Sequence, residues 1–165
     1  MIAEAGHFAL VLALFVAIVQ AVVPMIGAHR GNAVWMSMDK PSAISQVLLV
    51  SFAFGCLTYS HVVSDFSVVN VVQNSHSLKP MLYKVAGVWG NHEGSLLLWV
   101  FILAAFGSAV ALFGANLPPT LRARVLGVQS LIAVGFYLFM LLTSNPFERV
   151  FPPAMDGRDL NPLLQ

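Results

Sequence analysis

An all-α bundle of membrane-spanning helices is the fold class that this sequence predicts, and two observations carry the prediction. Hydrophobic residues make up 58% of the 165 residues and charged residues only 9%. In soluble domains, about 45–50% of residues are apolar and about 25% are charged. Four separate stretches are long and apolar enough to cross a bilayer, whose core takes roughly 20 helical residues. We expect helices because an open strand edge in lipid leaves backbone amides unpaired.

The first apolar stretch has an alternative interpretation as a cleaved signal peptide. Signal peptides begin with positive charge, but the start MIAEAGH contains Glu4 and neither Lys nor Arg. We therefore interpret this stretch as a span. The predicted spans cover residues 7–26, 43–63, 95–115 and 125–143.

A long loop and a polar tail complete the chain. The loop over residues 64–94 is longer than most connections, and loops of this length are often functional. Its β-branched stretch FSVVNVV is typical of a strand. The tail over residues 144–165 contains four prolines and five charged residues, so it cannot span. We expect a membrane domain over residues 1–143, followed by an extramembrane segment.

Basic residues in the connections predict the orientation, because cytoplasmic loops are enriched in Lys and Arg. The two short loops carry Arg30, Lys40, Arg122 and Arg124, and the N-terminus carries none. The other four basic residues lie in the long loop and the tail. Since short loops count most, we place both of them in the cytoplasm. The N-terminus, the loop 64–94 and the tail then lie on the outer side.

Several function classes are excluded or made less favourable by the residues present. A net charge of +1 gives no basic patch for nucleic acid, and the single Cys56 allows no internal disulfide. No acidic or basic residue lies deep in a span, which argues against a proton-driven transporter. Within the spans, Gln46, Gln129 and Tyr137 are expected to join helices by hydrogen bonds.

The stretch VWGNHEGSLLLW contains the strongest candidate site residues, Trp89, His92 and Glu93. Glu93 can orient an imidazole. Alternatively, its negative charge can interact with the positive N-terminal end of the next helix; both interpretations stay open. His61, at the end of the second span, is a weaker candidate for a place near a cofactor. The sequence assigns no catalytic group and no metal ligand.

Two long motifs, WGNHEGSLLLW and NPFERVFPPAMDGRDLNPLLQ, resemble the CcmF/NrfE family of cytochrome c-type biogenesis proteins. The resemblance covers essentially the whole chain and matches the N-terminal part of that family. Asn91 stands where many members have Ala. Members are several times longer, and their tryptophan-rich haem-binding segment and proposed haem-ligating histidines lie downstream. We therefore expect a fragment, or one piece of a split protein.

The resemblance implies a part in covalent attachment of haem to CxxCH apocytochrome c on the outer face of the membrane. It implies haem b as the substrate, a CcmE-type haem chaperone and a CcmH-type apocytochrome-presenting partner, and no nucleic acid. It also implies the bacterial inner membrane, with the N-terminus and loop 64–94 in the periplasm. This segment alone is expected not to catalyse the thioether-forming step. The alternative is a non-catalytic accessory subunit of a respiratory complex.

Overall fold

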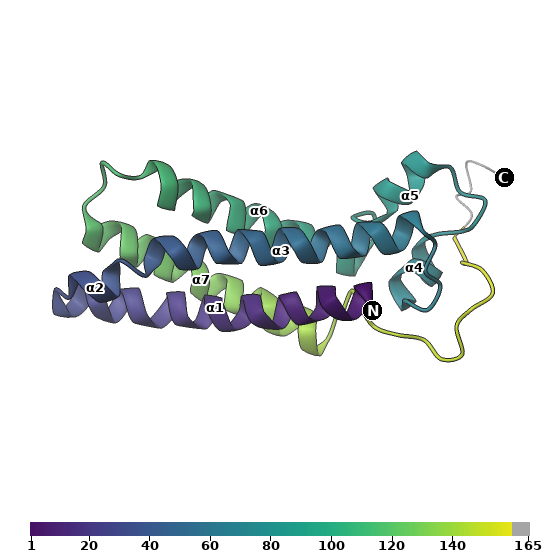
Figure 1. Cartoon of the computed structure of the whole chain (residues 1–165), viewed down its shortest axis with the longest axis horizontal. Coiled ribbons are helices and arrows are strands. Elements are labelled where there is room, and N and C mark those ends of the chain that lie inside the picture. Colours follow the sequence, from purple (N-terminus) through teal and green to yellow (C-terminus); the bar gives the residue numbers. More distant parts are fainter. Residues whose placement is uncertain (160–165) are drawn as a thin grey trace.

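The computed structural model describes residues 1–159, and within them it contains helices and turns but no strand. Four long helices lie side by side along one axis (Figure 1). Each is long and apolar enough to cross a membrane, which confirms the predicted all-α, multi-pass membrane fold. They are α1 (Ile2–Arg30), α3 (Asp39–Val62), α6 (His92–Phe113) and α7 (Pro119–Leu142), and the short helices are α2 (Ala33–Met36), α4 (Val69–Asn74) and α5 (Met81–Gly87).

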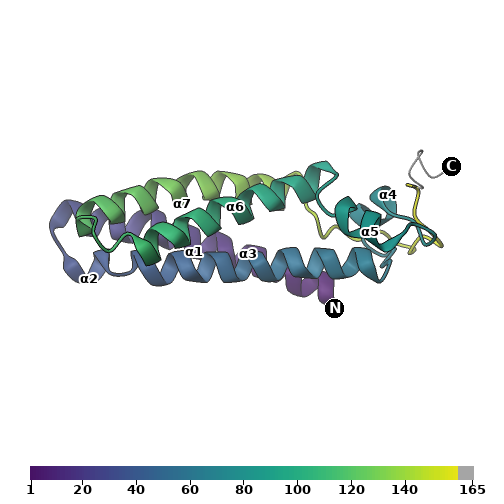
Figure 2. The ribbon, with the colours of Figure 1, turned by 90° about the horizontal axis from the view of Figure 1, so that it is seen from above.

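The connections between the long helices divide into two ends (Figures 1 and 2). Helix α2 and the turn between α6 and α7 lie at one end, which we call the short-loop end. The N-terminus, α4, α5 and the segment after α7 lie at the opposite end. We call residues 63–91 and 143–159, together with the first turn of α6, the cap. The two short loops therefore share one end, as the order of predicted spans requires.

Local signals set where the long helices begin and end. Gly31 adopts a left-handed conformation (φ 67°) and ends α1, a position where a side chain would be strained. The side chain of Asn91 caps the start of α6, and Pro119 opens α7 with a preset φ. Helix α6 ends at Phe113, before Gly114 and two residues short of the predicted span.

Small residues allow the helices to pack closely. Ala9, Ala13 and Ala17 lie on one face of α1 and are at most 3% exposed, and α1 packs against α3 and α7. Small residues at such an interface let backbones approach, which drives packing in lipid. Large side chains such as Phe15 and Phe106 are exposed on the outside of the bundle, as expected for a surface that faces lipid.

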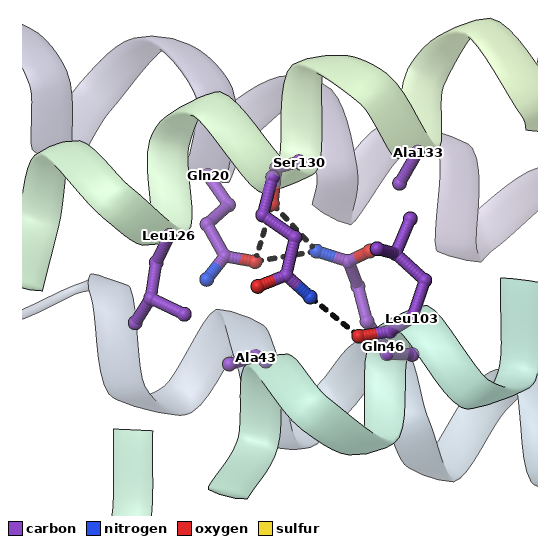
Figure 3. A pocket seen from close by; sticks show the side chains of 10 residues that line it. Gln20, Ala43, Gln46, Leu103, Leu126, Ser130 and Ala133 are labelled. Carbon is purple, nitrogen blue, oxygen red and sulfur yellow. Dashed lines mark hydrogen bonds between the residues drawn. The ribbon is translucent and has the colours of Figure 1, made fainter. Parts of the chain in front are cut away.

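A group of polar side chains, which we call the polar layer, lies between the long helices (Figure 3). Gln46 of α3 donates hydrogen bonds to Gln20 of α1 and to Ser130 of α7, while Ser130 donates to Gln20 at 2.9 Å. Tyr137 donates to Gln46 at 3.4 Å, and Gln129 donates to a backbone carbonyl of α6. The prediction that Gln46, Gln129 and Tyr137 join helices is confirmed. Together these hydrogen bonds connect all four long helices.

The expectation of a strand in FSVVNVV is wrong. Residues Val69–Asn74 form α4, and only Val68 makes a single antiparallel bridge, with Arg149. A lone bridge offers one partner rather than a sheet, so β-branched propensity is overridden by packing. Val71 and Val72 are buried in this helical form.

Candidate functional site in the cap

The segment after α7 is attached to the beginning of the long loop by backbone hydrogen bonds. Val69 N–H donates to the carbonyl of Glu148 at 2.9 Å, and Val150 N–H donates to the carbonyl of Ser67 at 3.0 Å. Farther along, Arg158 N–H donates to the carbonyl of Val72 at 2.7 Å. The two parts of the cap, about 80 positions apart in the chain, therefore form one layer.

Arg149 joins three parts of this end of the molecule. Its guanidinium donates to Glu4 in the first turn of α1 at 2.6 and 2.9 Å, to Asp65 at 3.3 Å, and to the hydroxyl of Ser67. Burial raises the pKa of Asp65, but hydrogen bonds from Ser67 and the charge of Arg149 outweigh it. The pKa of Asp65 therefore lies below its ordinary value.

A second set of side-chain contacts holds the end of the described tail. Asp156 accepts hydrogen bonds from the hydroxyl of Ser77 at 2.6 Å and from its backbone N–H at 2.9 Å. These bonds lower the pKa of Asp156 to about 2. Lys79 forms an ion pair with Asp159 at 2.8 Å. The tail is thus held by charged groups as well as by its backbone. Residues 160–165, which complete the predicted extramembrane segment, lie outside the described residues.

Asn91 organises the motif that the sequence singled out. Its Oδ1 accepts hydrogen bonds from Gly94 N–H at 2.7 Å and from the side chain of Asn70 at 2.8 Å. Its Nδ2 donates to the carbonyl of Gly87 at 2.8 Å. A Cβ at Gly94 would overlap the carbonyl oxygen of Val88. The turn between α5 and α6 therefore depends on both an amide at residue 91 and a glycine at residue 94.

Glu93 and His92 point to different neighbours. Glu93 accepts a hydrogen bond from Asn70 at 3.4 Å, while the exposed His92 places its ring edge-on to Phe139 of α7, with ring centroids 6.2 Å apart. Within residues 1–159 no hydrogen bond joins Glu93 to His92. The interpretation that Glu93 orients this imidazole gains no support from the geometry, and Asn91 supplies the cap of α6.

Trp89 offers an accessible aromatic surface next to these residues. It is 42% exposed, and its ring stacks on Phe54 of α3 with centroids 6.4 Å apart. Phe54 in turn stacks on Phe101 of α6 at 6.0 Å. This aromatic row links the cap to the membrane helices, with Trp89 at its open end.

His61 lies inside the helix packing rather than at a solvated interface. It is fully buried, and its Nδ1 lies 3.2 Å from the carbonyl oxygen of Leu57. The carbonyl only accepts, so this contact is a hydrogen bond in the tautomer that carries its proton on Nδ1, which leaves a lone pair on Nε2. Nε2 is buried without a partner among the described residues. Gly87 lies against this ring and also lines a pocket with Lys79 and Tyr83.

The structure brings Trp89, His92 and Glu93 into one turn and places His61 beneath α5. Sequence reasoning missed Asn70 and Arg149, which hold the cap together. The local pattern around Arg149 gave no signal of its partners, because those partners lie 82 to 145 positions away. A polar Asn70 between valines was the one visible hint of a buried amide.

Comparisons with known proteins match the whole chain. A family model described as "Cytochrome C assembly protein" matches residues 89–165. The cytochrome c-type biogenesis protein ccl1 of Rhodobacter capsulatus is 60% identical over all 165 residues of the chain, which cover 25% of that protein. The cytochrome c-type biogenesis protein CcmF of Pseudomonas aeruginosa is 52% identical, again with 25% of its length covered.

A solved structure shows the same fold. The chain superposes on a structure titled "Cytochrome c Heme Lyase CcmF" with a TM-score of 0.85 and 24% identity, over 90% of this chain and 25% of the other. The chain spans about a quarter of the length of the relatives that it matches. Over its whole length, the chain is therefore similar in sequence and in fold to about a quarter of the length of the CcmF-type cytochrome c-type biogenesis proteins.

Proposed function

We propose that this chain is the part of a cytochrome c maturation protein whose cap supports covalent attachment of haem to CxxCH apocytochrome c. The observation that supports this most is the cap itself. Arg149 joins the segment after α7 to the start of the long loop, and Asn70 of that loop donates a hydrogen bond to Asn91 of the WGNHEG motif at 2.8 Å. Relatives over the full length of the chain are cytochrome c-type biogenesis proteins, which favours this proposal over an accessory respiratory subunit.

The distribution of charge supports an orientation with the cap in the periplasm. Each end carries four basic residues, but those of the short-loop end lie in or next to the two short connections, where basic residues count most. Basic residues concentrate in cytoplasmic loops. We therefore place the short-loop end on the cytoplasmic side of a bacterial inner membrane. The N-terminus and the loop 64–94 then lie in the periplasm.

In this proposal, haem is a substrate. In the attachment step, each cysteine thiol adds its S–H across one vinyl group, which forms a thioether without net oxidation. No group of three or more His, Cys, Asp or Glu side chains that could hold a metal ion occurs among residues 1–159. We propose that this segment supports the attachment site and does not catalyse the step by itself.

Within the cap, we assign the supporting role to Trp89, His92 and Glu93. Trp89 presents an exposed ring, and flat aromatic ligands pack well against such surfaces. Glu93 fixes the turn through Asn70. His61 takes second place, because its free Nε2 is buried beneath α5. Reaching haem would require α5 to move.

The partners proposed for the cap are those of the same pathway. A CcmE-type chaperone would deliver haem, and a CcmH-type protein would present the reduced apocytochrome. We place both partners on the periplasmic side, where we also place the cap. Membrane lipid surrounds the helices.

The test uses the complete protein that contains this chain, expressed in a bacterium lacking its own copy. Trp89→Ala and His92→Ala are each compared with Trp99→Ala, which removes a similar exposed ring from the membrane face of α6. We expect the two cap variants to reduce haem-stained cytochrome c several-fold at unchanged membrane levels, and Trp99→Ala to leave it near wild type. Wild-type cytochrome c in both cap variants would contradict the proposal.

A further inference from the structure

The corner that joins α1 to α3 exposes apolar side chains at the short-loop end. The left-handed Gly31 turns the chain, and the side chain of Asn32 accepts hydrogen bonds from the backbone N–H groups of Val34 and Trp35. These bonds hold the one-turn helix α2 with Val34 73% exposed, and Trp35 and Met38 also exposed.

Three exposed basic residues lie at the same end of the bundle as this corner. Arg30 ends α1, Lys40 lies in the first turn of α3, and Arg124 lies in the first turns of α7. Within the described chain none of the three forms an ion pair. The acidic residue at this end, Asp39, is fully buried and bound to Arg122 at 2.8 Å. It therefore offers no neutralising charge at the surface.

We propose that this surface, formed by Arg30, Val34, Trp35, Met38, Lys40 and Arg124, is a binding surface for anionic phospholipid headgroups. Trp and apolar side chains settle at headgroup depth, while Lys and Arg attract lipid phosphates. Each cation contributes about a fivefold preference at a membrane surface. The arrangement combines both elements at the level where a spanning helix leaves the bilayer. This inference is independent of the proposed role in haem attachment.

The experiment reconstitutes the complete protein in nanodiscs of a neutral phosphatidylcholine. A small fraction of photoactivatable lipid is added, either phosphatidylglycerol or phosphatidylcholine with the same chains. Adducts are mapped by mass spectrometry to the peptide around α2 and, as an internal control, to the peptide around α5, where Leu78 and Leu82 are exposed. The variant Arg30→Gln/Lys40→Gln/Arg124→Gln is compared with Arg158→Gln, an exposed cation of the cap.

We expect at least a fivefold excess of phosphatidylglycerol adducts at α2, which falls in 0.5 M salt and approaches one in the triple variant. Arg158→Gln and the α5 peptide should show no such change. An equal yield from both lipids in the native protein would overturn the proposal. So would an excess that the triple variant retains. Adducts from neither lipid would mean that protein covers the corner, and would also overturn it.

Discussion

The guanidinium of Arg149 donates two hydrogen bonds to one carboxylate oxygen of Glu4, across 145 positions of the chain. The same guanidinium reaches Asp65 at the start of the long loop. One side chain thus fastens the segment after α7 to the first turn of α1 and to the cap. The direction in which the chain leaves the bundle is set by this contact.

Replacing Arg149 by Gln should loosen the cap without unfolding the bundle. The ion pairs are partly exposed, so the global stability should fall by only about 1 kcal/mol. Local opening should increase cleavage of residues 150–158 by added protease several-fold in the complete protein. Arg158, an exposed cation of the same segment, forms no ion pair within residues 1–159, so Arg158→Gln should leave the cleavage rate unchanged. Equal rates in both variants would show that Arg149 does not hold the tail.

Acid should release the end of the described tail. The pKa of Asp156 is lowered to about 2 in the folded chain from an ordinary value of 3.8, so its contribution is complete above pH 4. This contribution is lost as the pH falls toward 2. Met155 is fully exposed and can be replaced by a cysteine that carries a fluorophore. The fluorophore should report faster motion of the tail as the pH falls toward 2.

The variant Asp156→Asn removes the carboxylate that accepts both bonds from Ser77. In this variant the motion should already be fast at pH 7. Glu148→Gln, an exposed acidic residue of the same segment, serves as the matched control and should behave as the native chain. If Asp156→Asn showed the native pH profile, another group would hold the tail.

Two glycines should respond in opposite ways to substitution by alanine. Gly94→Ala places a methyl group on the carbonyl of Val88, so the turn before α6 must break, at a cost of about 3 kcal/mol or more. Gly55→Ala lies within α3 with open space around it, and should be neutral or stabilising by up to about 1 kcal/mol. Thermal unfolding of the complete protein in detergent measures both. Similar losses in the two variants would contradict the geometry around Gly94.

The polar layer should show coupling between helices. Gln46→Ala and Ser130→Ala each remove one partner of a hydrogen bond of 3.1 Å between α3 and α7. A double-mutant cycle should give a coupling of about 0.6 kcal/mol, the typical value for such bonds in a membrane protein. The pair Gln46 and Ser108 is a control, because Ser108 bonds instead to the carbonyl of Ala43. Additive effects of Gln46→Ala and Ser130→Ala would mean that the bond is not formed.

The bundle was readable from sequence because long apolar runs in lipid have one stable form, the helix. The polar residues Gln46 and Tyr137 were recognised as joining groups, but Gln20 and Ser130 were missed, since their pairing depends on the rotation of each helix. The helix α4 was also missed, because a β-branched run predicts a strand when no partner is known. The side chain of Asn91 proved to be the cap of α6.

The cap was only half predictable. The stretch containing Trp89, His92 and Glu93 stood out as a motif, but the structure directs the three side chains to different neighbours. The attachment of the long loop to the segment after α7 is non-local. It depends on isolated contacts, such as the bridge between Val68 and Arg149. Such contacts leave no periodic pattern in the sequence. The buried position of His61 likewise follows from α5 packing over α3, which a span boundary cannot show.

The most direct test concerns the side of the membrane on which the cap lies. Met155 in the cap and Val34 in α2 are both exposed, so each is replaced by a single cysteine. The native Cys56 is buried. In intact bacteria whose outer membrane has been made permeable, a membrane-impermeant thiol reagent should label Met155→Cys at once. It should label Val34→Cys only after the inner membrane is lysed. Labelling of Val34→Cys but not Met155→Cys in intact cells would place the cap in the cytoplasm and contradict its role in haem attachment.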